Sequence, residues 1–511
     1  MRLALALLLL SLGTLRAQQS CESLTSLTLP GVTISSATSV AAGPFTLPGS
    51  TRTIPAPAFC RVVAVGWPEI HFELWLPATW NRKFLGVGNG GLAGTINYAA
   101  MTSPIQTGYA TGSTDTGHQA SEVAWAAGHF QRIVDFGHRG IHVMTQADKA
   151  IIRAFYGQGP AHSYFDGCSN GGRQAFMEAQ RYPGDYDGIV AGDPAYDWSH
   201  LYSGGHVWTL KSLEGDSYIP AAKVPVIAQA VNEACDAADG VRDGILNDPR
   251  RCHFDPSTLS CKGSDKPDCL TGAQVMAVRK LWEGARTAAG DQIFPGLMPG
   301  GEDGPGGWSQ WITGNAPGTG GHAGLGIPGL RYIVYDDATW DWRSFKYDAP
   351  KGFDSDVEFV DHKAGPILNA TDPDLRPFQA RGGKLIHYHG WSDPDISPLS
   401  SIRYYEEAAK VVGHGSTHAL RDTSEFYRLF LVPGMQHCGG GPGPNAFSMI
   451  TALEQWVEKG VAPDQVIASH STNGSVDRTR PLCAYPKEAR YTGTGSTDQA
   501  ANFSCVLPIR P

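Results

Sequence analysis

The pentapeptide Gly167-Cys168-Ser169-Asn170-Gly171 constrains the fold of this chain more than any other stretch of the sequence. It fits the pattern Gly-x-Ser-x-Gly and lies between a predicted strand at residues 162–165 and a predicted helix that runs to residue 182. On such a strand-to-helix turn, the glycines tolerate the crowded backbone and the serine hydroxyl stands exposed above a sheet. The alternative is a glycine-rich turn with an incidental serine. The strand-turn-helix context favours a nucleophile at Ser169.

Predicted strands and helices alternate on both sides of a long middle segment, which indicates a parallel sheet with crossover helices. The predicted strands cover residues 70–76, 83–87, 162–165, 187–191, 384–389 and 427–432, and predicted helices lie within 139–156 and at 400–412 and 446–459. The middle segment is rich in Gly, Pro, Trp and Asp and shows little periodicity. We therefore predict an α/β core, residues 18–197 and 375–511, that is interrupted by a large, loop-rich lid insertion at residues 198–374.

The N-terminus has the pattern of a secretory signal peptide, which we place at residues 1–17. Met1 and Arg2 precede an apolar run at residues 3–12, and a small residue, Ala17, follows. This run is shorter than the roughly 20 residues that span a bilayer, so we expect an exported protein, secreted or periplasmic, with no membrane segment. Lys and Arg number 40 against 49 Asp and Glu, which gives a net charge of −9 and argues against nucleic acid as a partner.

The cysteine content agrees with export, because an even number of cysteines in an exported chain favours a full set of disulfides. The cysteines are Cys21, Cys60, Cys168, Cys235, Cys252, Cys261, Cys269, Cys438, Cys483 and Cys505. Their number alone does not determine the pairing. Zinc binding is the rival interpretation, but the sequence has no Cys-x-x-Cys. His387 and His389 have the spacing of a metal-binding pair, although their setting better suits the flank of a strand.

A serine nucleophile needs a base and an acid that orients the base. In α/β-hydrolases these partners follow in the order Ser, Asp or Glu, His. Asp393 and His437 lie in that order in the loops after two predicted strands. Asp395 and Asp193 are rivals for the acid; we prefer Asp393 and interpret Asp193 as a structural loop residue.

Two cysteines flank the predicted pair of nucleophile and base. Cys168 directly precedes Ser169, and Cys438 directly follows His437. If Ser169 and His437 lie within hydrogen-bond reach, their neighbours come near the Cα separation of about 4.4–6.8 Å that a disulfide requires. A Cys168–Cys438 bridge would join the two loops; the alternative is that each cysteine pairs elsewhere. The amide of Asn170, at the start of a helix, is a candidate oxyanion donor.

Together these residues resemble the tannase and feruloyl esterase family, which includes a bacterial hydrolase of mono(2-hydroxyethyl) terephthalate. Further similar stretches are 88–91, 187–194 and 389–394. The resemblance implies an α/β-hydrolase catalytic domain with a large lid. It makes Ser169 the nucleophile, His437 the general base and acid, and Asp393 the residue that orients His437. The oxyanion donors would be the amides of Asn170 and of Gly90 or Gly91. The sequence departs from the family at Asp395, where Leu or a similar residue is usual.

The resemblance also implies a disulfide pattern and a calcium site. The pairs would be Cys21–Cys60, Cys168–Cys438, Cys235–Cys252, Cys261–Cys269 and Cys483–Cys505. Segment 236–245 contains three carboxylates on a glycine-punctuated loop, and hard oxygen ligands suit calcium. Composition alone favours a solvated acidic loop, and the EF-hand pattern is absent. The family places a structural calcium on the side chains of Asp236, Asp239 and Asp243 and on the carbonyls of Val241 and Ile245; no organic cofactor is implied.

The insertion supplies aromatic residues that could form a pocket for a flat acyl group such as feruloyl, galloyl or terephthaloyl. They are Trp308, Trp311, Tyr332, Tyr335, Trp340 and Trp342; the alternative is that they belong to the core. Arg331 could pair with an acidic substrate or be an ordinary surface residue. We expect an exported serine carboxylesterase that acts on small esters of aromatic acids, feruloyl or galloyl. The alternatives are a terephthalate-ester hydrolase and, more distantly, a serine peptidase or a silent calcium-stabilised binding protein. The sequence indicates no oligomeric state.

Overall fold

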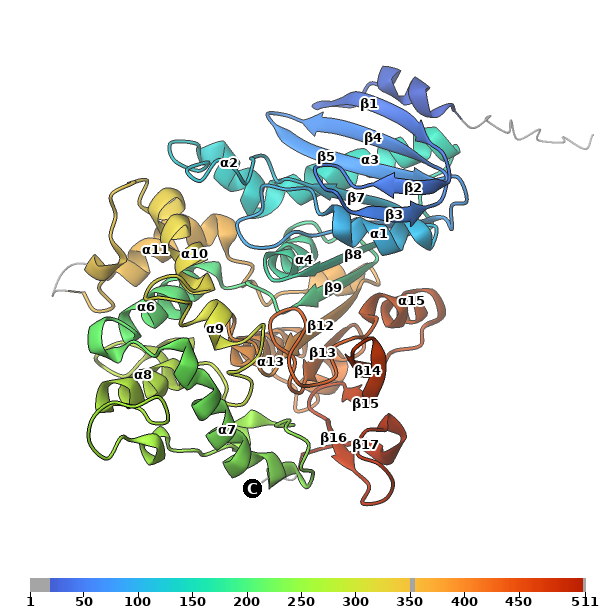
Figure 1. The fold of residues 1–511 in the computed structure, drawn as a ribbon. Helices are drawn as coiled ribbons and strands as arrows, with labels where there is room; N and C mark the ends of the chain where they lie inside the picture. Colours follow the sequence, from blue (N-terminus) through green and yellow to red (C-terminus); the bar gives the residue numbers. More distant parts are fainter. Residues whose placement is uncertain (1–18, 350–353, 509–511) are drawn as a thin grey trace, which may run out of the picture.

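A nine-stranded mixed sheet forms the centre of the computed structural model, which describes residues 19–349 and 354–508 (Figure 1). The predicted signal peptide lies outside these residues. In spatial order the strands are β1 (Val32–Val40), β4 (Phe59–Gly66), β5 (Ile70–Pro77), β7 (Ala110–Thr114), β6 (Lys83–Val87), β8 (His162–Cys168), β9 (Gly188–Gly192), β12 (Lys384–Gly390) and β13 (Tyr427–Val432). The strands from β7 to β13 run parallel, as predicted, whereas β1, β4 and β5 pair antiparallel.

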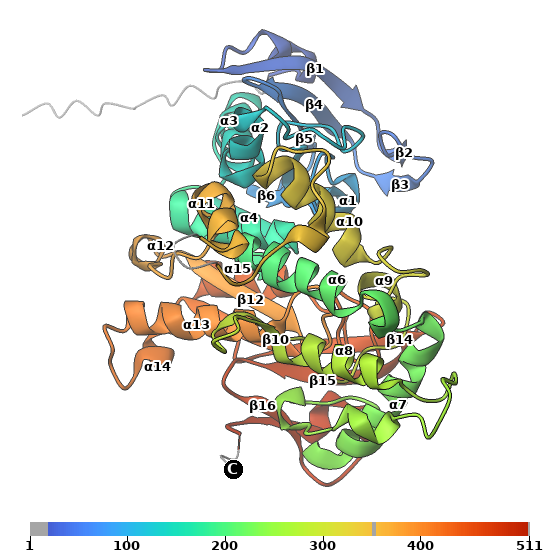
Figure 2. The same cartoon turned by 90° about the vertical axis from the view of Figure 1, so that its left-hand side faces the viewer.

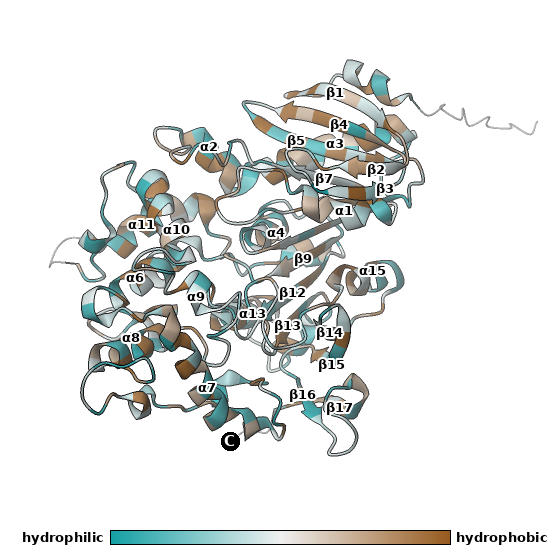
Figure 3. Cartoon of the chain, in the orientation of Figure 1, coloured by the Kyte–Doolittle hydropathy of each residue, from teal (hydrophilic) through white to brown (hydrophobic). Residues whose placement is uncertain are grey.

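Helices cover both faces of this sheet, so its central strands are buried on two sides. Neighbouring residues of one strand enter different hydrophobic clusters: Phe165 packs with α3 (Gly140–Tyr156), α4 (Asn170–Arg181) and α13 (Pro398–Val412). Its neighbour Tyr164 packs with α1 (Tyr98–Gln106) and α15 (Met449–Lys459). Towards the antiparallel edge, buried and half-buried residues alternate along β4, where one face is less covered. Hydrophobic and polar residues are mixed along the edge strand β1 (Figure 3).

The C-terminal part of the chain differs from the prediction at one helix boundary and in two added hairpins. The helix predicted at 446–459 begins at Met449, because Ala446 pairs with Ser469 as an isolated bridge and the Ser448 side chain caps the helix. The C-terminal region adds two hairpins that the sequence did not predict, β14 (Gln465–Thr472) with β15 (Ser475–Cys483) and β16 (Glu488–Tyr491) with β17 (Phe503–Val506).

Residues 198–374, which we call the insertion, lie beside the carboxyl ends of the parallel strands (Figures 1 and 2). The insertion contains more helix than its weak periodicity predicts: α5 (Trp198–His200), α6 (Trp208–Ser212), α7 (Val224–Cys235), α8 (Gly272–Glu283), α9 (Trp308–Trp311), α10 (Gly321–Pro328) and α11 (Asp356–Leu368). Its strands β10 (Gly284–Arg286) and β11 (Gln292–Pro295) pair with each other. Segments of this region pack into two hydrophobic clusters, one of which also contains core residues such as Trp125 and Phe136.

Five disulfides join all ten cysteines, in the pairs that the family resemblance implied. They are Cys21–Cys60, Cys168–Cys438, Cys235–Cys252, Cys261–Cys269 and Cys483–Cys505. Four bridges close short stretches of chain, whereas Cys168–Cys438 spans 270 residues. Among the described residues, no helix is both long and apolar enough to cross a membrane.

Candidate active site

Ser169 occupies the sharp turn between β8 and α4 that the Gly-x-Ser-x-Gly pattern predicts. Its backbone has φ 64° and ψ −122°, a strained conformation for a residue with a side chain. Hydrogen bonds from Ser169 N to Gly192 O and from Ala195 N to Ser169 O hold the turn against the end of β9. Glycine is required beside it, because a Cβ on Gly167 would lie 2.5 Å from the carbonyl oxygen of Gly171.

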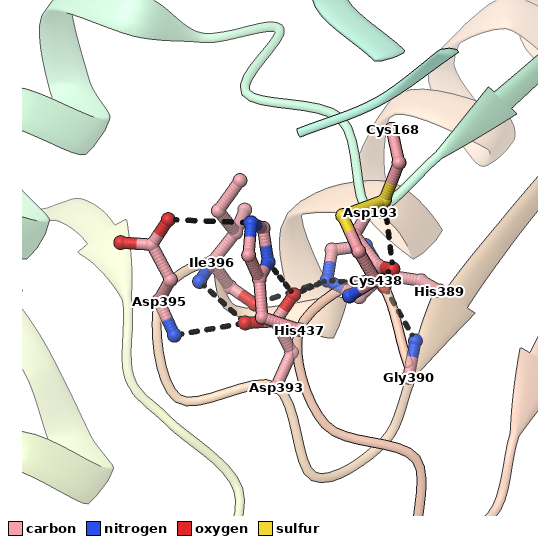
Figure 4. Close-up of a disulfide and its surroundings, with 9 residues drawn as sticks. All are labelled: Cys168, Asp193, His389, Gly390, Asp393, Asp395, Ile396, His437 and Cys438. Atoms are coloured by element: carbon pink, nitrogen blue, oxygen red, sulfur yellow. Dashed lines mark hydrogen bonds and ion pairs between the residues drawn. A yellow bond between two sulfur atoms is a disulfide. The ribbon is translucent and has the colours of Figure 1, made fainter. Parts of the chain in front are cut away.

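His437 and Asp393 form a buried pair at the ends of β13 and β12 (Figure 4). His437 Nδ1 lies 2.8 Å from Asp393 Oδ2, and Asp393 Oδ1 accepts hydrogen bonds from the amides of Asp395 and Ile396. Burial disfavours both charges. The attraction between the two groups outweighs it and lowers the pKa of Asp393, while Asp393 and then Asp395 raise the pKa of His437. The pair is therefore arranged to stabilise a positively charged imidazole.

The Cys168–Cys438 disulfide joins the turn that carries Ser169 to the loop that carries His437, with a Cα separation of 6.0 Å. Asp193 supports the same junction. Its Oδ1 accepts a hydrogen bond from Gly390 N at 2.7 Å, and its Oδ2 accepts one from Cys438 N at 2.9 Å. These contacts agree with the interpretation of Asp193 as a structural residue.

Ser169 and His437 line one pocket, but in the described part of the chain no hydrogen bond joins Ser169 Oγ to His437. Hydrogen bonds of this kind are often long in ligand-free hydrolases and tighten when substrate binds. The Nε2 atom of His437 instead lies 3.6 Å from Asp395 Oδ2. Asp395, a rival for the acid in the sequence, thus faces the other side of the ring from Asp393.

Two of the predicted oxyanion donors line the same pocket, and the third, Asn170, directly follows Ser169 in the chain. Asn170 is the first residue of α4, and Gly90 and Gly91 line the pocket together with Ser169. The loop of the two glycines is fixed by Asn89, whose side chain accepts a hydrogen bond from Gln174 Nε2 at 2.6 Å and donates to two backbone carbonyls. Backbone amides are therefore available close to the serine.

The pocket has a volume of about 590 Å³. Of the six aromatic residues named from the insertion, Trp311 lines it, with its ring centroid 5.0 Å from that of His437. The other five, Trp308, Tyr332, Tyr335, Trp340 and Trp342, pack in the hydrophobic clusters of the insertion. Arg331 binds the carbonyl oxygen of Trp340.

The pocket residues from the core that sequence reasoning missed include Tyr109, Asp166 and Tyr388. The period of two along a strand could have indicated Asp166, because it lies on the same side of β8 as Cys168. Burial raises the pKa of Asp166 to about 6. His387 and His389 lie in β12 and contact Tyr427 and Ser401, so they are residues of the strand.

The acidic loop at residues 236–245 does not line this pocket. Asp236 and Asp239 accept hydrogen bonds from backbone amides of their own loop, and Asp243 pairs with Arg480 at 2.6 Å. Among the described residues, these carboxylates do not form a group of three whose ligand atoms lie within 4.8 Å of one another. Burial, and then the charge of Asp243, raises the pKa of Asp239 to about 6.

Known proteins resemble this chain in sequence and in fold. A family model described as "Tannase and feruloyl esterase" matches residues 55–506. An uncharacterized esterase of Xanthomonas campestris is 40% identical over 97% of this chain and 92% of its own. The mono(2-hydroxyethyl) terephthalate hydrolase of Piscinibacter sakaiensis is 36% identical over 87% of this chain and 82% of its own. The crystal structure of feruloyl esterase B from Aspergillus oryzae superimposes with a TM-score of 0.85 at 30% identity, covering 95% of this chain and 99% of that one.

Proposed function

Because the chain belongs to the tannase and feruloyl esterase family and is a carboxylic ester hydrolase, we propose that it hydrolyses esters of aromatic acids through Ser169, His437 and Asp393. One observation carries this proposal. The strained turn of Ser169 is tied by the Cys168–Cys438 disulfide to a histidine whose Nδ1 is hydrogen-bonded to a buried aspartate.

In the proposed mechanism, Ser169 Oγ attacks the ester carbonyl while His437 Nε2 takes its proton. Asp393 holds the proton on Nδ1 and stabilises the imidazolium. The oxyanion is stabilised by the amide of Asn170 and by an amide of the Gly90-Gly91 loop. His437 returns the proton to the leaving alcohol, and water hydrolyses the acyl-enzyme by the same steps. The insertion acts as the lid, since its Trp311 lines the pocket and packs edge-to-face against His437.

Asp166 favours a feruloyl or galloyl group over a terephthaloyl group. A carboxylate in the pocket wall can accept a hydrogen bond from a phenolic hydroxyl, whereas it repels the free carboxylate of mono(2-hydroxyethyl) terephthalate. Mono(2-hydroxyethyl) terephthalate is the alternative substrate, because a relative of this chain is a hydrolase of that ester.

A hydrolysis panel tests the proposal, with methyl ferulate, methyl gallate, mono(2-hydroxyethyl) terephthalate and a peptide anilide as substrates. We expect turnover of a phenolic ester that is lost in Ser169→Ala. Faster turnover of the terephthalate ester would transfer the assignment to the alternative, and cleavage of the anilide alone would indicate a peptidase. A folded protein inactive on all four would overturn the catalytic assignment.

We also propose that the acidic loop binds a structural calcium ion through the side chains of Asp236, Asp239 and Asp243 and the carbonyls of Val241 and Ile245. Asp239 and Asp243 repel each other in the ion-free arrangement, and a cation relieves that repulsion. Asp243 would have to leave Arg480 to complete the site. Calcium should then raise the melting temperature relative to a chelator, and Asp239→Asn should abolish the difference. No calcium effect on wild-type melting would refute the site.

Export is proposed from residues 1–17 and from the disulfides. Determination of the mature N-terminus after expression with the full leader tests it: a chain that starts near residue 18 and is found outside the cytoplasm is expected. An uncleaved chain that stays in the cytoplasm would contradict the proposal.

A further inference from the structure

Three buried side chains meet beside the candidate active site, where the insertion packs on the core. They are His206 of the helical segment Leu201–Val207, His322 of α10 and Asp395 of the loop after β12. His206 Nε2 lies 3.0 Å and His322 Nε2 lies 3.4 Å from Asp395 Oδ1. Each side chain is at most 2% exposed, so solvent does not satisfy their polar atoms.

The two histidines are incompletely satisfied by the protein. Neither ring nitrogen of His322 has a hydrogen-bond partner among the described residues, and the same holds for His206 Nδ1. Buried polar groups normally find partners, because an unpaired one loses its hydration without compensation. His322 Nε2 faces the carboxylate of Asp395 at 3.4 Å without a hydrogen bond, so this buried nitrogen is free to bind a ligand.

We propose that His206, His322 and Asp395 bind a divalent transition-metal ion of the zinc class. Two imidazole nitrogens and one carboxylate oxygen are a common ligand set for such ions. Ligand atoms about 2.0–2.1 Å from a tetrahedral ion lie about 3.3 Å from one another. The separations from Asp395 Oδ1 lie on either side of that value, and the three ligand atoms all lie within 4.8 Å of one another.

Two other groupings of metal-binding residue types do not support a site. In the first, Cys168 and Cys438 with Asp193, the two sulfurs are joined in a disulfide. In the second, Asp193 and Asp393 with His389, Asp393 already binds His437, and Asp193 accepts hydrogen bonds from two backbone amides. Of the three groupings found among the described residues, the cluster at His322 is the one with unpartnered nitrogens.

A bound ion would connect three segments far apart in the sequence. It would join two helical segments of the insertion to the loop that carries Asp393. Figure 4 shows Asp395 on this loop with one oxygen facing His437 and the other directed away from it. Because a folded-state ligand stabilises the folded state by mass action, the ion would raise the stability of this junction.

Cobalt(II) is the probe for this site, because its visible absorption reports the ligands and the coordination number. Wild-type protein in calcium-containing buffer is titrated with Co²⁺, and metal content is counted after gel filtration. We expect one ion per chain, a four- or five-coordinate spectrum and a raised melting temperature. His322→Leu and Asp395→Asn should weaken binding more than about 100-fold, since even outer-shell changes cost 10–100-fold.

His142→Gln is the matched control. His142 lies on α3, away from the proposed metal site, and pairs with Asp185, so the change also removes a histidine that contacts an aspartate. It should bind Co²⁺ like the wild type. Circular dichroism establishes that each variant is folded. The metal content of the wild type tests the site even if a variant fails to fold. A wild-type spectrum of the aqua ion, absence of retained cobalt, or equal binding by both ligand variants and the control would overturn the site.

Discussion

The Nε2 atom of His437 lies 3.6 Å from Oδ2 of Asp395, on the opposite side of the imidazole from Asp393. Asp393 is within hydrogen-bond distance of the ring, at 2.8 Å, and Asp395 is not. The second oxygen of Asp395 lies against His206. Two acids that are two residues apart therefore make different contacts. Asp393 is hydrogen-bonded to His437, and Asp395 lies between His437 and His206 of the insertion.

Asp393→Asn should reduce kcat on the preferred ester by about 10⁴, because the amide can no longer hold His437 in the required tautomer. Asp395→Asn should reduce kcat less than about tenfold, since it removes no hydrogen bond of His437. Steady-state kinetics of both purified variants on one substrate make the comparison. Equal losses would show that the acid has been misassigned.

The residues of the candidate site could be predicted from the sequence where a local sequence pattern marks them. Ser169, Asp393 and His437 each lie just after a strand, and the adjacent cysteines indicated the disulfide between two of these loops. His206 and Asp395 are 189 residues apart, and His322 comes from a further helix, so no local pattern could have brought them together. The departure at Asp395 was the one available signal.

The fold shows the same division. Strands rich in apolar residues, such as Lys83–Val87 and Tyr427–Val432, were predicted with the same first and last residues that the structure shows. Strand β7 was missed because its sequence, Ala-Thr-Gly-Ser-Thr, has almost no apolar side chains although every residue is buried. Its Gly112 lies against Asp148, where a Cβ would approach Oδ2 to 2.0 Å. The burial of β7 results from tertiary packing, which the strand propensities of its residues do not predict.

Asp193→Ala should destabilise the protein, because it leaves the buried amide of Gly390 and the partly buried amide of Cys438 without acceptors. Each unsatisfied donor costs about 1–3 kcal/mol. We expect a lower urea midpoint together with a lower kcat, since the His437 loop loses its anchor. Asp187→Ala, which removes one amide contact from an exposed aspartate, is the control and should change both little. Unchanged stability of Asp193→Ala would contradict this account.

Asp166→Asn should shift the substrate preference rather than abolish activity. The neutral amide no longer repels the carboxylate of mono(2-hydroxyethyl) terephthalate. Its kcat/KM should therefore rise relative to that of dimethyl terephthalate, which has no free carboxylate. The ratio for methyl ferulate against methyl cinnamate should fall, because a charged acceptor for the phenol is lost. Kinetics on the four esters measure both ratios. If neither ratio moves, Asp166 does not contact the acyl group.

His200→Gln should lower stability in a pH-dependent way. Burial opposes the charge on His200, but Asp197 and Asp361 outweigh it and raise its pKa to about 10 from 6.5. Between these values the folded state binds more protons than the unfolded state, so this stabilisation is complete below about pH 6.5 and is lost as the pH rises towards 10. The difference in melting temperature between wild type and variant should shrink across that window. A constant difference would show that the charge does not contribute.

Removal of the Cys168–Cys438 bridge should impair both stability and catalysis. The bridge restrains 270 residues of chain, against 8 for Cys261–Cys269, and longer loops gain more from closure. We expect Cys168→Ala with Cys438→Ala to lose about 3–5 kcal/mol of unfolding free energy. It should also lose kcat, because the neighbours of Ser169 and His437 are no longer joined. The Cys261→Ala and Cys269→Ala pair, measured by the same urea unfolding and kinetics, should lose less stability and keep its kcat. Equal loss of kcat in the two double variants would mean that the bridge has no special part in positioning the site.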